Sequence, residues 1–99
     1  MTAYLLADVP PDDPEAYAAS GYLDAAKQTS RAYGGVYKAR GGATTVLEGA
    51  WEPDRMVLIE FPSMDDLLAW YHSPEYQNWV AVRQKFVPNS RLVALEGVD

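Results

Sequence analysis

Short, largely apolar runs that end at charged residues, prolines or glycines recur along this 99-residue chain, and such runs are typical of β-strands. Residues 3–9, 55–61 and 91–96 are predicted strands on this pattern, and residues 36–40 form a fourth. Gly41-Gly42 interrupts the fourth strand, which is expected to resume over residues 44–47. Paired glycines inside a strand mark a bulge or a close backbone approach.

Two helical regions lie between these strands. Asp12-Asp13-Pro14-Glu15 predicts a helix start, because Asp accepts hydrogen bonds from free N–H groups and Pro is tolerated in the first turn. This helix is expected to run to about Tyr33, where Gly34-Gly35 ends it. Ser63 and Ser73-Pro74-Glu75 predict the starts of two further helical segments, which reach to about Phe86.

The resulting order is β-α-β-β-α-β, which is the ferredoxin-like pattern of the α+β class. It predicts a four-stranded antiparallel sheet with the helices on one face, within a single domain over residues 1–99.

Successive side chains of a strand point to opposite faces of the sheet, so the residues of the predicted strands fall into two sets. One set is almost wholly apolar and is expected to face the helices: Leu5, Ala7, Val9, Val57, Ile59, Phe61, Val93 and Leu95. The opposite set mixes apolar and charged residues: Tyr4, Leu6, Asp8, Met56, Leu58, Glu60, Leu92, Ala94 and Glu96. The second face is too apolar for water and too charged for an ordinary core, so it predicts a homodimer formed through the sheets.

Composition excludes several classes of function. The chain has 8 basic and 14 acidic residues, and its net charge of -6 argues against binding nucleic acid or anionic membranes. Cysteine is absent, which excludes disulfides, thiolate metal sites and cysteine nucleophiles. The N-terminal apolar run stops at Asp8, too early for a signal peptide or a membrane span, so a cytoplasmic location is expected.

A set of short motifs extends across nearly the whole chain: Tyr17 after Asp13-Pro14-Glu15, Tyr33-Gly34-Gly35, Ala39-Arg40-Gly41-Gly42, Leu47-Glu48-Gly49, Glu60-Phe61-Pro62-Ser63, Trp70-Tyr71, Ser73-Pro74-Glu75-Tyr76 and Glu96-Gly97. In this order and spacing they resemble domain-of-unknown-function family 1330, within the dimeric α/β-barrel superfamily. The resemblance implies a ferredoxin-like subunit and a dimer with its sheets face to face, but no particular reaction. The wider superfamily implies small-molecule chemistry in a pocket between the sheet and the helices.

Three residues are candidates for catalysis. Arg40 precedes the glycine pair and could hold a carboxylate or enolate, or it could form a structural ion pair with Glu60 or Glu48. Glu60 follows an apolar run and could remove a proton next to a carbonyl, or it could be a rim residue or an ion-pair partner. His72 is the one histidine, and is either an acid–base group at a pocket mouth or a surface residue.

Aromatic residues supply the candidates for substrate binding. Trp70 and Tyr71 belong to an aromatic helical layer that could line a pocket or simply fill the core, and Tyr4 lies on the mixed sheet face. Ser63 and Ser73 are interpreted as helix caps, and His72 with Glu75 supplies too few ligands for a metal site.

The leading hypothesis is therefore a cofactor-free, homodimeric small-molecule enzyme of the isomerase, cyclase, lactone hydrolase or monooxygenase type. Its substrate is expected to be a small carbonyl-bearing or aromatic compound. The alternative is a non-catalytic dimer that binds a metabolite or stabilises a partner. Haem binding through His72 is a third, weaker hypothesis.

Overall fold

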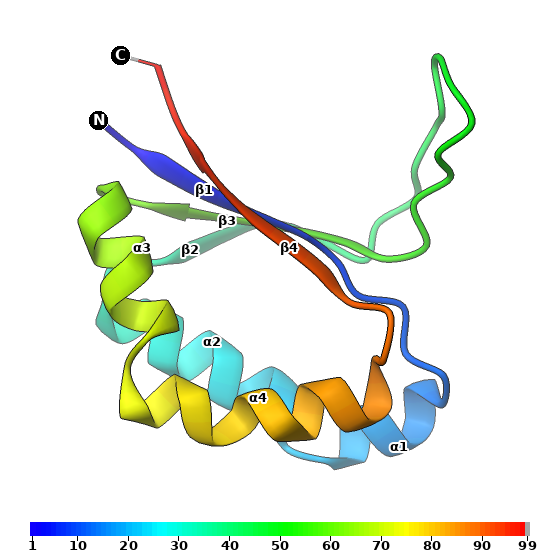
Figure 1. Cartoon of the computed structure of the whole chain (residues 1–99), viewed down its shortest axis with the longest axis horizontal. Helices are drawn as coiled ribbons and strands as arrows, with labels where there is room; N and C mark the ends of the chain where they lie inside the picture. The colour runs from blue at the N-terminus through cyan, green and yellow to red at the C-terminus, as the bar shows by residue number, and fades with distance from the viewer. Residues whose placement is uncertain (99) are drawn as a thin grey trace.

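The computed structural model describes residues 1–98, so residue 99 of the predicted domain lies outside the described range. Figure 1 shows a sheet with all its helices on one side. The elements in chain order are β1 (Ala3–Asp8), α1 (Pro14–Ala19), α2 (Tyr22–Ala32), β2 (Val36–Arg40), β3 (Met56–Phe61), α3 (Met64–Tyr71), α4 (Pro74–Phe86) and β4 (Arg91–Glu96). None of the helices within residues 1–98 combines the length and apolar character needed to cross a bilayer.

The sheet has the order β2-β3-β1-β4, and every neighbouring pair is antiparallel. This arrangement confirms the ferredoxin-like order predicted from the sequence, with each helical connection divided into two helices. The predicted caps are also present. The side chains of Asp13, Ser63 and Ser73 each accept a hydrogen bond from a backbone N–H three residues further on.

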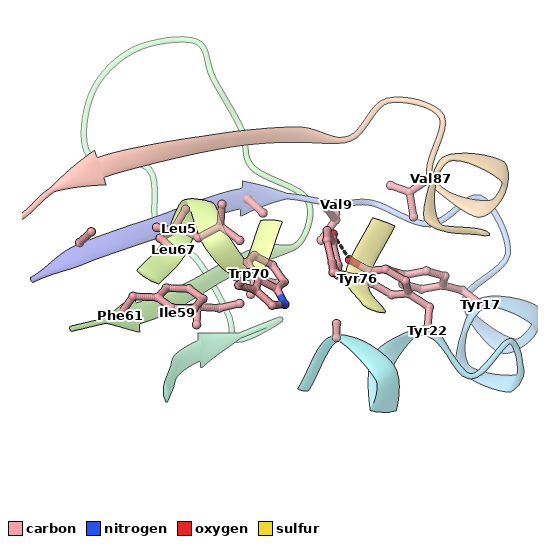
Figure 2. Close-up of a cluster of buried hydrophobic side chains, with 14 residues drawn as sticks. Leu5, Val9, Tyr17, Tyr22, Ile59, Phe61, Leu67, Trp70, Tyr76 and Val87 are labelled. Atoms are coloured by element: carbon pink, nitrogen blue, oxygen red, sulfur yellow. Dashed lines mark hydrogen bonds between the residues drawn. The ribbon is translucent and has the colours of Figure 1, made fainter. Parts of the chain in front are cut away.

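The core lies between the helices and one face of the sheet (Figure 2). Leu5 of β1 and Ile59 of β3 are paired in register, and both are buried beneath the helices. Trp70 stacks at a tilt on Phe61, with ring centroids 5.4 Å apart, and its indole Nε1 donates to the Thr29 hydroxyl over 3.0 Å. The largest side chains of the core are therefore aromatic, and the polar atom of Trp70 is satisfied.

The predicted orientation of β4 is wrong. Leu92 lies opposite Ala7 of β1 and packs against the core, whereas Val93 and Leu95 point to the other face and are 58% and 55% exposed. The reason is the register, because a shift of one residue exchanges the two faces of a strand. We call the sheet face away from the helices the open face. It carries Tyr4, Leu6, Val36, Met56, Leu58, Glu60, Val93 and Leu95.

The first helical region is predicted as one continuous helix to about Tyr33, but in the structure it consists of two helices, α1 and α2. It is divided at Gly21, which has a φ of 89° in the left-handed region. The Ser20 hydroxyl donates to the Tyr17 carbonyl and accepts from the Tyr22 N–H, which satisfies both helix ends at the break. The buried residues consequently follow the stripe Tyr22, Ala26 and Ser30 in α2.

Residues 41–55 form a long exposed loop, so the strand expected over residues 44–47 is absent. We call this segment the arm. Figure 1 shows it extending from the sheet on the side away from the helices. At its base, the Gly41 N–H donates to the Met56 carbonyl and the Asp8 carboxylate accepts from the Arg55 N–H. The arm carries the exposed apolar side chains Val46, Leu47 and Trp51.

The turn after α2 requires a glycine at position 34. Gly34 has a φ of 87°, and a Cβ there would lie 2.8 Å from Cγ of Pro62. We expect Gly34→Ala to lower the free energy of unfolding by about 1–3 kcal/mol, because backbone strain adds to a steric clash. Gly42→Ala is the matched control, since a Cβ at position 42 meets nothing within 4 Å. Urea denaturation of both variants tests this, and equal stabilities would contradict it.

Candidate functional site

A cavity of about 30 Å³ lies between the helices and the sheet, and its lining includes Arg40 and Arg55, at the two ends of the arm. Its volume is enough for one or two water molecules. Apolar residues of α2, β1, β3 and β4 form most of the walls, together with Trp70 of α3. The polar lining residues are Tyr17, Tyr22, Tyr37, Arg40, Arg55 and Tyr76.

A β-bulge directs Arg40 into this cavity. Tyr37 pairs with Ile59 and Ala39 with the next residue along β3, Leu58, so Lys38 is an extra residue in β2. The bulge restores Arg40 to the helix side of the sheet, where it pairs in register with Val57. Its guanidinium lies over the Tyr37 ring, 5.3 Å from the centroid. The bulge predicted at the glycine pair is wrong, because β2 ends at Arg40; the bulge lies inside the strand, at Lys38.

Lys38 itself takes the opposite direction. Its Nζ lies 3.2 Å from Oε2 of Glu60, which is the one ion pair among residues 1–98. The predicted pairing of Arg40 with Glu60 or Glu48 is therefore wrong for the described residues. Glu60 faces the open side of the sheet, and Arg40 faces the cavity.

Hydrogen bonds connect two tyrosines of the cavity lining, Tyr22 and Tyr76, to the buried side chain of Arg83. The hydroxyls of Tyr22 and Tyr76 lie 2.7 Å apart (Figure 2), and Arg83 Nη1 donates to the Tyr76 hydroxyl over 2.6 Å. Tyr76 and Arg83 are both on α4, seven residues and thus about two turns apart. Arg83 is only 3% exposed, and its Nε has no hydrogen-bond partner in the described part of the chain.

Burial keeps three phenols of the cavity, those of Tyr17, Tyr37 and Tyr76, protonated. Loss of solvation raises the pKa of Tyr37 to about 12, and it also raises the pKa values of Tyr17 and Tyr76 well above the ordinary tyrosine value. Near neutral pH these side chains are therefore neutral hydroxyls that can donate hydrogen bonds. Arg40 and Arg55 add two permanent positive charges.

The structure brings together only some of the predicted site residues. Arg40 and Trp70 both line the cavity. Tyr71 is half-buried and packs edge-on against Trp70, with ring centroids 6.3 Å apart, but it does not line the cavity.

The other predicted site residues lie elsewhere. Tyr4 is opposite Glu60 on the open face, across the sheet from the cavity. His72 is exposed at the corner between α3 and α4, with its ring 5.2 Å from that of Tyr71. Within residues 1–98 there is no group of three or more acidic or histidine side chains that could hold a metal ion.

Sequence reasoning missed the link between Tyr22, Tyr76 and Arg83. One signal was available, because Arg83 lies on the same stripe of α4 as Tyr76, two turns away. A cation on the buried stripe of a helix is unusual and indicates a polar partner inside the fold. The partner hydroxyl of Tyr22 lies 54 residues from Tyr76, so sequence spacing could not identify it.

Comparison with known proteins gives a family and a fold. The family model described as "Domain of unknown function (DUF1330)" matches residues 2–98. No curated protein sequence matches the chain. Among solved structures, a protein of unknown function from Rhodopseudomonas palustris is similar with a TM-score of 0.74 and 23% identity, over 99% of this chain and 83% of that one.

Two other solved structures have the same fold at lower identity. One, from Caulobacter crescentus, is provisionally named an antibiotic biosynthesis monooxygenase. Its TM-score is 0.70 at 19% identity, over 99% of this chain and 91% of that one. The other is described as a dimeric ferredoxin-like protein of unknown function from Thermobifida fusca. Its TM-score is 0.63 at 16% identity, over 98% of this chain and 92% of that one.

The bond between Arg83 and Tyr76 can be tested through stability. Tyr76→Phe leaves the buried guanidinium without its acceptor, so we expect the free energy of unfolding to fall by about 2 kcal/mol. Tyr33→Phe is the control, because the hydroxyl of this half-buried tyrosine makes no hydrogen bond within residues 1–98. It should change stability by less than about 0.5 kcal/mol. Similar losses in both variants, measured by urea denaturation, would argue against the bond.

Proposed function

This chain belongs to the DUF1330 family, and we propose that it is a homodimeric small-molecule enzyme that works without a cofactor. Each subunit binds a small carbonyl-bearing or aromatic compound in the cavity between sheet and helices. The observation that carries this proposal is the convergence of Arg40, Arg55 and four tyrosines on one largely apolar cavity. Such a combination of apolar walls and a few directed polar groups is typical of ligand sites.

Arg40 is the residue proposed to hold or polarise an oxygen of the substrate. It lies at an exposed position of the cavity lining, and the Lys38 bulge and the Tyr37 ring fix its direction. A guanidinium there stabilises negative charge that develops on a carbonyl or phenol oxygen. Trp70 supplies an apolar wall, but it is packed against Phe61 and Tyr76, so a planar compound reaches it only when side chains of the lining move.

A non-catalytic binding protein is the second candidate, because the described lining of the cavity contains neither a carboxylate nor an imidazole. Glu60 and His72 lie outside the cavity of their own subunit, so a proton-transfer role for them requires a different surface. An enzyme with this lining is suited to reactions that depend on the stabilisation of an oxyanion, and less suited to reactions that need a strong base. A binding protein would show affinity without turnover.

The proposed dimer rests on the open face and the arm. Val36, Val93 and Leu95 are large apolar side chains of the open face that are each more than half exposed. Trp51 of the arm and Leu6, Met56 and Val93 border a groove of about 270 Å³ beside this face. A second copy that packs its own open face here would cover both surfaces, and the similar protein from Thermobifida fusca is described as dimeric.

Light scattering tests the dimer, for which we expect twice the 11.0 kDa mass of one chain. Val93→Glu places a carboxylate in each half of the proposed interface, so it should weaken association by about a hundredfold or more. Leu68→Glu introduces the same charge at an exposed position of α3, and it should remain dimeric. A single-chain mass for the unmodified protein at micromolar concentration would refute the dimer.

Ligand binding is tested by thermal denaturation with a library of small carbonyl and aromatic compounds. We expect at least one compound to raise the Tm, and Arg40→Gln to weaken its binding by about 10- to 100-fold, as expected for loss of a charged hydrogen bond. Lys38→Gln is the matched control, because Lys38 is on the same strand but pairs with Glu60 across the open face. The proposal fails if no compound binds, or if the two variants behave alike.

A further inference from the structure

Arg83 is a charged side chain placed in the interior without an acidic partner. It is 3% exposed, and the one ion pair among residues 1–98 joins Lys38 to Glu60 instead. A buried cation without a counter-charge is costly to a fold. The hydroxyl of Tyr76 accepts from its Nη1, and its Nε has no partner among the described residues. The positive charge of Arg83 is thus only partly compensated by the protein.

The hydrogen bond from Arg83 limits how the hydroxyls of Tyr22 and Tyr76 can bond. A guanidinium can only donate, so the Tyr76 oxygen must accept in that bond. The bond between Tyr22 and Tyr76 then uses one of their two hydroxyl hydrogens, whichever residue donates. The hydrogen bonds of residues 1–98 provide no acceptor for the other one. Both residues line the cavity, so the pair has one free O–H to offer a molecule bound there.

The remaining polar groups of the cavity are donors as well. Arg40 and Arg55 can only donate, and the hydroxyls of Tyr17 and Tyr37 make no hydrogen bond within residues 1–98. Carboxylates do not occur among the described lining residues. A cavity with two cations, a third behind the tyrosine pair and no negative charge complements a molecule with negative oxygen atoms.

We propose that the cavity is a receptor for a small organic oxyanion, whose negative oxygen accepts the free O–H of the Tyr22–Tyr76 pair backed by Arg83. This inference rests on the proposed function, because it takes the same cavity as the ligand site, and it names the chemical class of the ligand. The shared feature is a deprotonated oxygen, supplied by a carboxylic acid or by an enol or phenol. Burial raises the pKa of Tyr76 well above the ordinary tyrosine value, so this hydroxyl keeps its hydrogen in the neutral range.

The size of the cavity determines which part of the ligand it can hold. About 30 Å³ suffices for the oxygen-bearing end, where it would displace water from the tyrosine pair. The rest of the molecule would extend toward Arg40 and Arg55, with displacement of the half-buried Leu23 side chain. Arg40 is exposed and makes no ion pair within the described residues, so it is available to meet a second oxygen at the mouth.

Three anionic probes test the inference on the full chain: acetate, benzoate and 4-nitrophenolate, with benzamide as a neutral partner of benzoate. Isothermal titration should give binding of at least one anion, and benzamide should bind at least about tenfold more weakly than benzoate, as expected for loss of a charge-assisted hydrogen bond. Preference for benzoate or for 4-nitrophenolate distinguishes a carboxylate site from an enolate or phenolate site. Bound 4-nitrophenol should also ionise at a lower pH than the free compound, measured by its absorbance.

Two variants connect the effect to the proposed groups. The double variant Tyr22→Phe/Tyr76→Phe removes both hydroxyls, because either single variant would leave the remaining hydroxyl free to donate. It should reduce anion affinity about tenfold while benzamide binding stays unchanged. Arg83→Lys keeps the charge but not the guanidinium, and it should reduce the ionisation shift of 4-nitrophenol. Tyr33→Phe is the control and should bind like the unmodified protein. Circular dichroism verifies that each variant is folded. If Arg83→Lys does not fold, the double variant decides, and if neither folds, the comparison of benzoate with benzamide on the unmodified protein decides.

The outcomes separate this inference from the proposed function. If benzamide binds as well as benzoate, or if none of the three anions binds while a neutral library compound does, the oxyanion receptor is refuted and the small-molecule site remains. Unchanged anion binding in the folded double variant Tyr22→Phe/Tyr76→Phe also refutes it. If no compound of any charge binds, both proposals fail together.

Discussion

One-sided packing of the sheet is the constraint from which the rest of the structure follows. Successive side chains of β1 and β3 point to opposite faces, and helices cover only one of these faces. Leu5 and Ile59 are therefore buried, while Leu6 and Leu58 lie on the open face. The same arrangement creates both proposed working surfaces. The cavity forms where the helical layer meets the sheet, and the open face remains for a second copy of the chain.

A single backbone irregularity then distributes the cations of β2. The extra residue Lys38 reverses the alternation of the strand, so that Arg40 points to the same face as Tyr37. Without the bulge, Arg40 would lie on the open face and the cavity would lose one of its two lining arginines. Lys38 meanwhile pairs with Glu60 and neutralises a carboxylate on the face proposed for dimerisation. One inserted residue thus serves both surfaces.

The parts of the fold that could be predicted are those set by local chemistry. The caps at Asp13, Ser63 and Ser73 use hydrogen bonds within three residues, so the sequence around each one suffices. The orientation of β4 is not local, because Leu92, Val93, Ala94 and Leu95 are all apolar and either parity gives an apolar face. Only the pairing with β1 decides between them.

The break at Gly21 was missed for a similar reason. A glycine within an amphipathic pattern is compatible with a continuous helix, and its left-handed φ becomes visible only in the structure. A Cβ there would approach the Trp79 ring of α4 to 3.3 Å, a contact between residues 58 positions apart. The break also places Tyr22 on the buried stripe of α2, from which its hydroxyl reaches Tyr76.

The candidate site shows the same division between local and distant information. The glycines that follow Arg40 mark it locally, whereas Arg83 is marked only by its place on the stripe of Tyr76, and its link to Tyr22 depends on a distant part of the chain. The presence of Arg83 behind Tyr22 and Tyr76 changes the chemistry that the cavity can support. A cavity with Arg40 and a base such as Glu60 would remove a proton from its substrate. The observed lining has donors and no base, so it suits a molecule that is already ionised or that becomes negative on oxygen during the reaction. A reaction at this proposed site would therefore act on a substrate that ionises without a base from the described lining of the cavity.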